Sequence, residues 1–234
     1  MECHGDTLDI ISPPFDLILP LNGSEVHTMN GLQLNHLYNM DCMEGMKQFP
    51  DKYFELAIVD PPYGIGASTM KRGNSVIKPD KTKRWDDAIP SDYYFEELNR
   101  VSQNQIIWGG NYFNLPPTRC ILVWDKGESM YGRSFSEIEM AWTSFSGSAR
   151  IFKYSPNDPF RIHPTQKPVK LYEWLLRNYA YEGDKILDTH VGSASSLIAC
   201  YNYGFEYMGF EIDKEYYDKA TERLEAVKNQ MSMF

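Results

Sequence analysis

The feature that most constrains the fold is a short apolar run, residues 56–59, followed at once by an aspartate and two prolines. The run contains no polar residue, which is typical of a strand buried on both faces of a parallel sheet. Pro61 and Pro62 then end the strand, because neither can donate a backbone hydrogen bond. Their fixed φ angles hold Asp60 and Tyr63 at the carboxyl end of the strand, where open α/β sheets bind ligands.

The Asp-Pro-Pro-Tyr tetrapeptide at 60–63 also groups three chemical functions. Asp60 offers a carboxylate acceptor, the prolines offer carbonyls outside the strand ladder, and Tyr63 offers one aromatic face. This set suits a planar ring whose amino group is held in place. A strand-ending turn with an incidental tyrosine is about equally compatible with these four residues alone.

The rest of the chain alternates between two kinds of pattern. Short apolar stretches predict strands at residues 36–40, 105–108, 120–124, 138–145, 185–188 and 207–211, besides 56–59. Helical spacing is found over residues 43–48, 92–101, 169–181, 196–203 and 214–229. Strands that alternate with helices predict an α/β fold: a doubly wound, mostly parallel sheet of seven strands with helices on both faces.

The length of 234 residues suits one domain, which we place at residues 34–234, after a poorly defined extension at 1–33. No apolar run reaches the length of a membrane span, and no signal peptide opens the sequence. We therefore expect a cytoplasmic protein. The cysteines lie far apart without a CxxC pair, so we expect packed thiols and no metal site: Cys3, Cys42, Cys120 and Cys200.

The formal net charge of -9 argues against a nucleic-acid partner, because DNA favours cationic surfaces. Charge is unevenly distributed, however. One stretch holds six basic residues against a single acidic residue, Asp80: Lys71, Arg72, Lys78, Lys81, Lys83 and Arg84. We expect a mobile basic loop at about residues 64–88 that binds DNA. A solvated loop without a partner fits the charges equally well.

A second constellation lies near the carboxyl end of the chain. A predicted strand ends at Asp188, a turn with Gly192 and a helix follow, and the next strand ends at Glu211. Gly192 lets the backbone approach a ligand, and a carboxylate at Glu211 can accept both ribose hydroxyls. A dinucleotide fits this pattern as well as S-adenosylmethionine does. The turn lacks the full GxGxxG pattern and has no basic group for a pyrophosphate, which favours the methyl donor.

Three motifs carry a resemblance to a known family. They are Asp-Pro-Pro-Tyr at 60–63, Trp-Asp-Lys at 124–126 and His-Pro-Thr-Gln-Lys-Pro at 163–168. In these motifs and their order, the chain resembles the circularly permuted β-type amino (N6-adenine/N4-cytosine) DNA methyltransferases from about residue 34 to the end. The resemblance implies a Rossmann-like methyltransferase sheet, S-adenosyl-L-methionine as cofactor and DNA as partner. It places the protein in a prokaryote or phage, in the context of restriction–modification.

The resemblance also implies roles for individual residues. Asp41 would border the adenine of the cofactor, although it could equally be a helix N-cap. Thr165 and Lys167 would hold the methionine carboxylate. The implied cofactor set is Asp41, Cys42, His163, Thr165, Gln166, Lys167, Pro168, Asp188, His190, Gly192, Ser193, Ser195 and Glu211. The sequence departs from the family at Ala194, where the usual turn has a second glycine.

The implied reaction is methyl transfer to the N6 of adenine in DNA. Asp60 and the Pro61 carbonyl would accept the amino hydrogens, Pro62 would stiffen the motif, and Tyr63 would stack on the flipped base. N4-cytosine methylation, an RNA or protein-glutamine methyltransferase, and a catalytically silent DNA-binding module are the alternatives. We expect sequence recognition to come from a short segment at about residues 143–162, from the loop at residues 64–84 or from a partner, and the sequence leaves a homodimer open.

Overall fold

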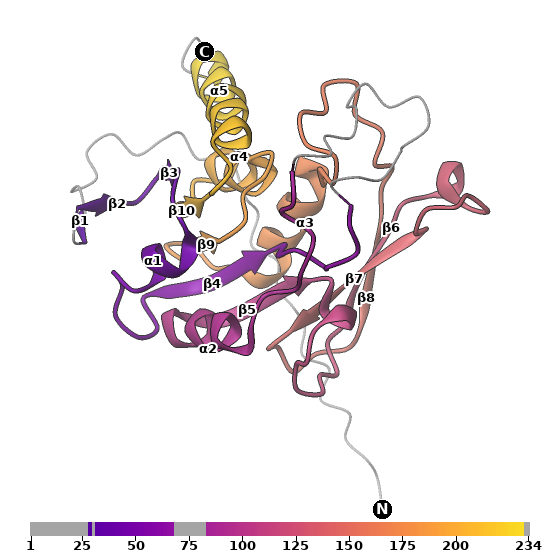
Figure 1. The fold of residues 1–234 in the computed structure, drawn as a ribbon, viewed down its shortest axis with the longest axis horizontal. Coiled ribbons are helices and arrows are strands. Elements are labelled where there is room, and N and C mark those ends of the chain that lie inside the picture. The colour runs from indigo at the N-terminus through magenta and orange to yellow at the C-terminus, as the bar shows by residue number, and fades with distance from the viewer. Residues whose placement is uncertain (1–27, 30, 68–82, 232–234) are drawn as a thin grey trace, which may run out of the picture.

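The computed structural model of the protein describes residues 28–29, 31–67 and 83–231 (Figure 1). Its centre is an eight-stranded sheet in the order β3-β10-β9-β4-β5-β7-β6-β8, and β1 and β2 form a separate two-stranded sheet. The strands are β1 (Thr28–Met29), β2 (Leu32–Gln33), β3 (His36–Tyr38), β4 (Phe54–Val59), β5 (Ser102–Trp108), β6 (Leu122–Asp125), β7 (Ile138–Thr143), β8 (Arg150–Lys153), β9 (Lys185–Asp188) and β10 (Glu206–Phe210). The helices are α1 (Cys42–Met46), α2 (Asp92–Val101), α3 (Val169–Tyr179), α4 (Ser195–Asn202) and α5 (Lys214–Met231), with 3-10 turns η1 (Gly110–Tyr112) and η2 (Glu128–Met130).

The sheet confirms the predicted α/β class, with one correction to its size. Strands β3, β10, β9, β4 and β5 are mutually parallel, whereas β7 runs antiparallel to β5 and β6. The described sheet has eight strands rather than seven, because β8 pairs with β6 in parallel. Three of the four β8 side chains are exposed, so the strand has no apolar run to reveal it. It lies inside the segment that we predicted for sequence recognition.

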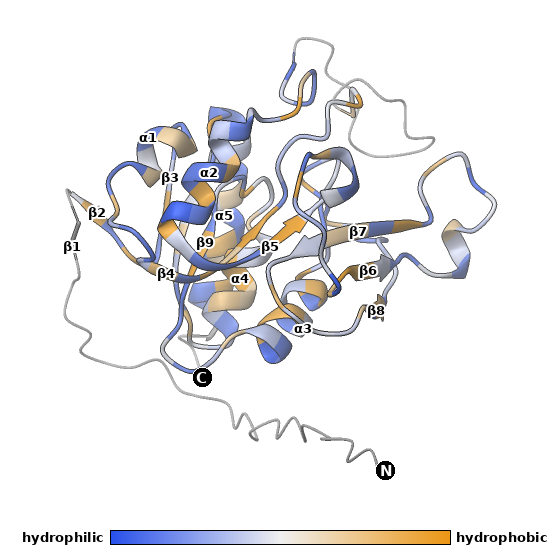
Figure 2. Cartoon of the chain, turned by 90° about the horizontal axis from the view of Figure 1, so that it is seen from below, coloured by the Kyte–Doolittle hydropathy of each residue, from blue (hydrophilic) through white to orange (hydrophobic). Residues whose placement is uncertain are grey.

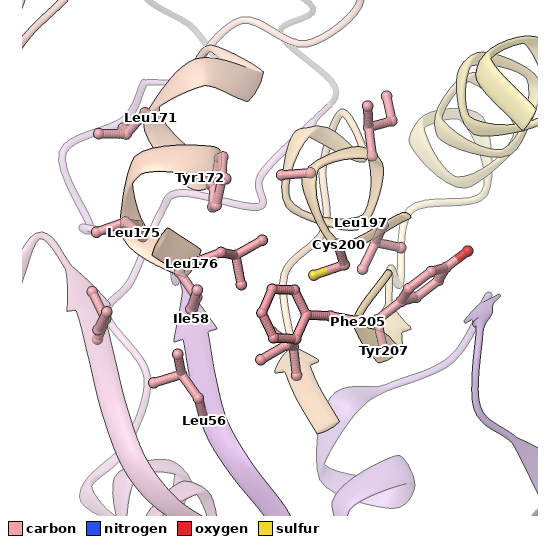
Figure 3. Packing of buried hydrophobic residues seen from close by; sticks show 14 of the residues in the cluster. Leu56, Ile58, Leu171, Tyr172, Leu175, Leu176, Leu197, Cys200, Phe205 and Tyr207 are labelled. Carbon is pink, nitrogen blue, oxygen red and sulfur yellow. The ribbon is translucent and has the colours of Figure 1, made fainter. Parts of the chain in front are cut away.

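Strand β4 is buried on both faces, as its composition predicts. Leu56 and Ile58 belong to one core cluster, with apolar residues of α3, α4 and α5, whereas Ala57 and Val59 belong to the other, with residues of α1 and α2. Figure 3 shows Leu175 and Leu176 of α3 beside the first pair. The alternation of side chains along the strand therefore divides one apolar run between two cores.

The helices cover the two faces of the sheet, and α2 and α3 are amphipathic, whereas α4 is buried along most of its length. Figure 2 shows hydrophobic and hydrophilic residues along these helices. In α3, Leu171, Leu175 and Leu176 are buried, while Lys170 and Arg177 are exposed. Among the described helices, none is both long and apolar enough to cross a membrane.

The order of strands creates a switch point between β4 and β9. From β4 the chain continues through α2 to β5 on one side, and from β9 it continues through α4 to β10 on the other. Crossovers that diverge in this way leave a crevice at the carboxyl ends of the two strands. Asp60, Asp188 and Glu211, which end or follow three of the parallel strands, therefore share one edge of the sheet.

Candidate active site

The Asp60 carboxylate is held by two side chains. Its Oδ1 accepts a hydrogen bond of 2.6 Å from the Tyr63 hydroxyl, and its Oδ2 lies 2.5 Å from the Lys167 ammonium. Only 2% of the Lys167 side chain is exposed. Burial raises the pKa of Asp60, and the Lys167 ammonium and the Tyr63 hydroxyl oppose that rise. The predicted catalytic carboxylate thus faces a buried positive charge.

Glu139 of β7 extends this contact into a row of four charges. Its Oε2 lies 2.9 Å from Lys167 Nζ, and its Oε1 lies 2.8 Å from Lys126 Nζ. Burial would raise the pKa of Glu139, but the two ammonium groups together lower it to about 2. Because β7 is antiparallel to β5, its first residues lie at the same edge as Asp60. Carboxylates and ammonium groups therefore alternate across the site.

The Tyr63 ring is packed tightly. Its plane stacks on Tyr112 at a centroid distance of 4.9 Å and an angle of 14°. Gly109, with φ of +71°, lies against the ring so closely that a Cβ there would be 2.1 Å from Tyr63 Cε1. The glycine turn after β5 is therefore required both by its left-handed backbone and by the position of Tyr63.

A large cavity of about 680 Å³ opens beside these residues. Its wall includes all four residues of the predicted catalytic motif, together with Lys126, Glu139 and Lys167. Arg133, from the turn between β6 and β7, and Arg161 also line it. The cavity thus joins the predicted catalytic motif to segments outside the sheet.

A second, smaller cavity of about 100 Å³ lies at the ends of β9 and β10, and Asp41, Cys42, His190 and Glu211 are among its wall residues. Asp41 caps α1, because its carboxylate accepts a 2.8 Å hydrogen bond from the Met43 amide. Burial raises the pKa of Cys42 to about 12, so its thiol stays protonated. Asp41 therefore acts as a cap and also borders the cavity.

Glu211 is fixed by backbone donors. Its carboxylate accepts hydrogen bonds from the amides of Gly192 at 2.8 Å and Asp213 at 2.9 Å. Burial raises the pKa of Glu211, and these two donors oppose the rise. A carboxylate has about four acceptor sites, so two remain for a ligand.

The turn after β9 is partly held by hydrogen bonds to its own Asp188 carboxylate. Asp188 accepts hydrogen bonds from the Ser196 hydroxyl and, at 3.0 Å, from the His190 amide, while burial raises its pKa to about 7. Burial lowers the pKa of His190 to about 4, so the imidazole is neutral near pH 7. Ala194, where the family has glycine, adopts φ of +62° and is completely buried. The turn therefore keeps its left-handed form despite the side chain.

The serines of this turn serve the structure. Ser193 and Ser195 lie with their hydroxyl oxygens 3.1 Å apart, and both residues are buried. Arg223 of α5 donates to the Ser193 carbonyl at 2.6 Å and to the Ser195 hydroxyl at 2.9 Å. Their predicted part in cofactor binding remains a prediction.

The His-Pro-Thr-Gln-Lys-Pro motif links several segments. The Thr165 hydroxyl lies 3.1 Å from His163 Nδ1, and the Gln166 amide donates to Asp158 at 2.7 Å. Pro168 stands just before α3. Lys167 alone among them reaches Asp60, a contact that the resemblance does not imply.

The predicted basic loop lies partly outside the described residues. The structure does not describe four of its cations, Lys71, Arg72, Lys78 and Lys81. Cys3 also lies outside the described residues. Lys83 is not a free surface cation: its ammonium contacts Asp213 at 2.6 Å and Glu215 at 2.9 Å. Arg84 pairs with Asp87, but 81% of its side chain is exposed.

Several residues of the site escaped sequence reasoning. Glu139 sits in a strand of otherwise ordinary alternation, and the one available signal was its position at the start of that strand. Tyr112 and Asp86 gave no signal, because their contacts with residues 63–67 depend on tertiary structure. Within the described ranges, no group of His, Cys, Asp and Glu side chains could hold a metal ion.

The edge of the sheet has the donor and acceptor set that a nucleoside with an amino-acid tail requires. Asp41 and Glu211 supply acceptors at the smaller cavity, and apolar contact there comes from Cys42 and Ile212. Thr165 and Lys167 supply donors at the larger cavity. The residues present therefore fit S-adenosylmethionine.

A doubly wound sheet with this cradle and an Asp-Pro-Pro-Tyr motif at its switch point is the arrangement that the resemblance to amino DNA methyltransferases predicts. Residues 122–222 match the sequence model of a family described as DNA methylase. The "Putative methylase YubD" of Escherichia coli (strain K12) is 25% identical over 220 residues, which span 82% of this chain and 90% of that protein. The Type II methyltransferase M.HpaI of Haemophilus parainfluenzae is 42% identical over 67 residues, 29% of this chain and 21% of that protein.

A solved structure, the M1.HpyAVI–SAM complex, superposes with a TM-score of 0.55 at 20% identity, over 80% of this chain and 98% of that chain. This similarity shows the fold. In sequence the chain is similar to DNA methylases over part or most of its length.

Proposed function

We propose that the protein transfers a methyl group from S-adenosyl-L-methionine to the N6 amino group of adenine in DNA. The observation that carries this proposal is the Asp60 carboxylate beside Tyr63, in the wall of a 680 Å³ cavity at the switch point of the sheet. The carboxylate and the Pro61 carbonyl can together accept both hydrogens of an exocyclic amino group. Aspartate as the first residue of the motif favours adenine over cytosine within the family.

The amino nitrogen is a weak nucleophile, because its lone pair is conjugated into the ring. When bound, S-adenosylmethionine supplies an electrophilic methyl group. Hydrogen bonds from the amino group to Asp60 and Pro61 turn the nitrogen toward tetrahedral geometry and free its lone pair. Positioning and electrostatic stabilisation supply the remaining acceleration. No covalent intermediate is required, which agrees with the protonated thiol of Cys42.

Two sets of residues divide the binding of cofactor and base. Asp41 and Glu211 hold the adenosine part, and Thr165 binds the methionine tail. The main role of Lys167 is to position Asp60, because its ammonium group already contacts Asp60 and Glu139. Its second role is to attract the methionine carboxylate. Tyr63 receives the base flipped out of the duplex. The motif order, with catalysis before cofactor binding, supports the circularly permuted β type and a single domain at residues 34–234.

Nucleoside analysis tests the proposal. The protein is incubated with labelled S-adenosylmethionine and duplex DNA of mixed sequence, and the DNA is digested to nucleosides. We expect label in N6-methyl-2′-deoxyadenosine. Label in N4-methylcytosine would mean that cytosine, not adenine, is the target base. In parallel reactions with RNA or a glutamine-containing peptide in place of DNA, label there and none in DNA would mean that DNA is not the substrate. Cofactor binding without any transfer would leave a silent binding module.

A further inference from the structure

Asp86 is a carboxylate buried beneath the turn that follows the catalytic motif. Its Oδ1 accepts hydrogen bonds from the amides of Tyr63 at 2.6 Å and Gly64 at 2.9 Å. Its Oδ2 accepts one from Ala67 at 2.7 Å, and its own carbonyl accepts one of 3.0 Å from Gly66. Only 1% of the residue is exposed. Four of the five amides in residues 63–67 therefore end on this one residue.

The catalytic motif creates the need for such an acceptor. Pro61 and Pro62 have no N–H group, so Tyr63 is the first residue after Asp60 with a backbone donor to satisfy. The sheet offers it no partner, because β4 ends at Val59. A buried amide without an acceptor is unfavourable, and an ionised acceptor forms stronger hydrogen bonds than a neutral one.

The position of Asp86 is set independently of Tyr63. Three residues earlier, Lys83 contacts two carboxylates near the start of α5 and lies 4.2 Å from the centre of the Tyr216 ring. The ring of the preceding residue, Trp85, lies 5.1 Å from that of His163. The segment 83–86 is thus attached to the cofactor side of the molecule. Asp86 connects that side with the turn that carries Tyr63.

We propose that Asp86 is a positioning residue for base capture: it fixes the main chain of Tyr63, so that the ring stays in the cavity and the hydroxyl stays on Asp60. The inference rests on the proposed function. It assigns Asp86 no contact with the base or the cofactor. Loss of the Asp86 carboxylate should therefore weaken base flipping and methyl transfer to DNA, and it should leave the affinity for the cofactor unchanged.

The test compares Asp86→Asn with Asp184→Asn. Asp184 also accepts a backbone hydrogen bond, from Tyr181 at 2.8 Å, but it lies in the turn before β9.

The substrate is a duplex that the wild-type protein methylates, and a second duplex carries 2-aminopurine at the target base. In Asp86→Asn, we expect kcat/KM for DNA to fall roughly tenfold or more, since small misplacements of reacting groups are costly. The fluorescence rise of the flipped 2-aminopurine should be lost, while cofactor affinity by calorimetry stays unchanged. Asp184→Asn should behave as wild type.

The outcomes separate the two proposals. If the wild-type protein methylates no DNA, the proposed function fails. If the wild type methylates DNA and Asp86→Asn flips and methylates equally well, Asp86 is not a positioning residue. An equal loss of cofactor affinity and base flipping would also overturn the inference, because it would indicate a general structural role.

A measurement on the wild-type protein covers the case in which Asp86→Asn does not fold. Amide hydrogen exchange of Tyr63, Gly64 and Ala67, followed by NMR, reports on the three hydrogen bonds directly. Slow exchange in all three supports the anchor, and exchange at the rate of an open loop overturns it.

Discussion

The two halves of the candidate site hold their carboxylates in different ways. On the cofactor side, Glu211 and Asp188 are held mainly by backbone amides and a hydroxyl from nearby turns. On the catalytic side, Asp60 is held by Lys167, which is 107 positions away in the chain, and Lys167 in turn contacts Glu139. Local turns therefore build the first half, and tertiary packing of charges builds the second.

This difference determines what a substitution does in each half. The donors on the cofactor side are neutral, so the loss of one acceptor there leaves no buried charge without a partner. Removal of one charge on the catalytic side leaves a buried partner without compensation, which is costly at low local dielectric. Substitutions on the cofactor side should therefore weaken mainly cofactor binding, and substitutions on the catalytic side should slow mainly methyl transfer.

The largest effect is expected for Asp60→Ala. It removes the acceptor for the amino group, so transfer should fall by about 10²-fold or more, as for other positioned groups that stabilise charge. Cofactor affinity should stay nearly intact, because Asp60 lies on the catalytic side. Single-turnover transfer and calorimetry measure the two quantities, and Asp60→Asn serves as the variant of equal shape. Full activity of Asp60→Ala would refute its catalytic role.

Glu211→Ala should give the reverse pattern. It should weaken cofactor binding by about 1–3 kcal/mol, the range for losing hydrogen bonds to a charged group. Saturating cofactor should restore much of the transfer rate. Glu206→Ala, at the opposite end of β10, is the control. Unchanged affinity in a folded Glu211→Ala protein would remove this residue from the cofactor site.

A pH titration of stability tests the buried Asp188. Its pKa is about 7 in the folded protein against about 3.9 in an unfolded chain. The protonated form is thus favoured by folding, and its stabilising contribution is complete below about pH 4 and lost as pH rises to about 7. The free energy of unfolding of wild type, relative to Asp188→Asn, should fall by up to about 1.4 kcal/mol per pH unit in this window.

The comparison with Asp188→Asn is needed because His190 acts in the opposite direction. The pKa of His190 is about 4 in the folded protein. Its contribution to the free energy of unfolding is therefore complete above about pH 6.5 and is lost as the pH falls to about 4. The two residues partly cancel in the wild-type curve. Urea unfolding from pH 4 to 8 gives both curves, and parallel curves would contradict the raised pKa of Asp188.

Glu139→Gln tests the row of charges on the catalytic side. Lys126 and Lys167 would lose their shared carboxylate, and Lys167 would pair more strongly with Asp60, in competition with the amino group. We expect a decrease in transfer of about tenfold, within the range for buried charged partners. Because Glu139 raises the pKa of Asp60, the acid limb of the rate profile should also move to lower pH. Glu137→Gln, in the adjacent turn, is the control; equal effects of both variants would exclude the charge row.

The same division explains what the sequence could predict. Strands β4, β9 and β10 and the turn with Gly192 leave local signals, since apolar runs and glycine mark them without knowledge of neighbours. Glu139 leaves only its position at the start of a strand, and that position points to the site only when the antiparallel direction of β7 is known. Strand β8 was missed because three of its four side chains are exposed. Asp86 was missed because its partners are backbone amides some twenty positions earlier.

The smallest effect concerns two adjacent cations, Lys83 and Arg84. The sequence predicts that both bind DNA, but the structure gives them different surroundings. Lys83 is bound to carboxylates on the cofactor side, with 12% of its side chain exposed, whereas Arg84 is largely exposed. Arg84→Gln should therefore reduce the slope of log affinity for DNA against log salt by about 0.9, the value for one phosphate contact. Lys83→Gln should leave that slope unchanged and lower the thermal midpoint instead, because it breaks the attachment of residues 83–86 to α5. Fluorescence anisotropy over a salt series measures the slopes, with thermal unfolding of the same samples. A reduced slope in Lys83→Gln would mean that Lys83 exchanges its carboxylate partners for phosphate on DNA binding.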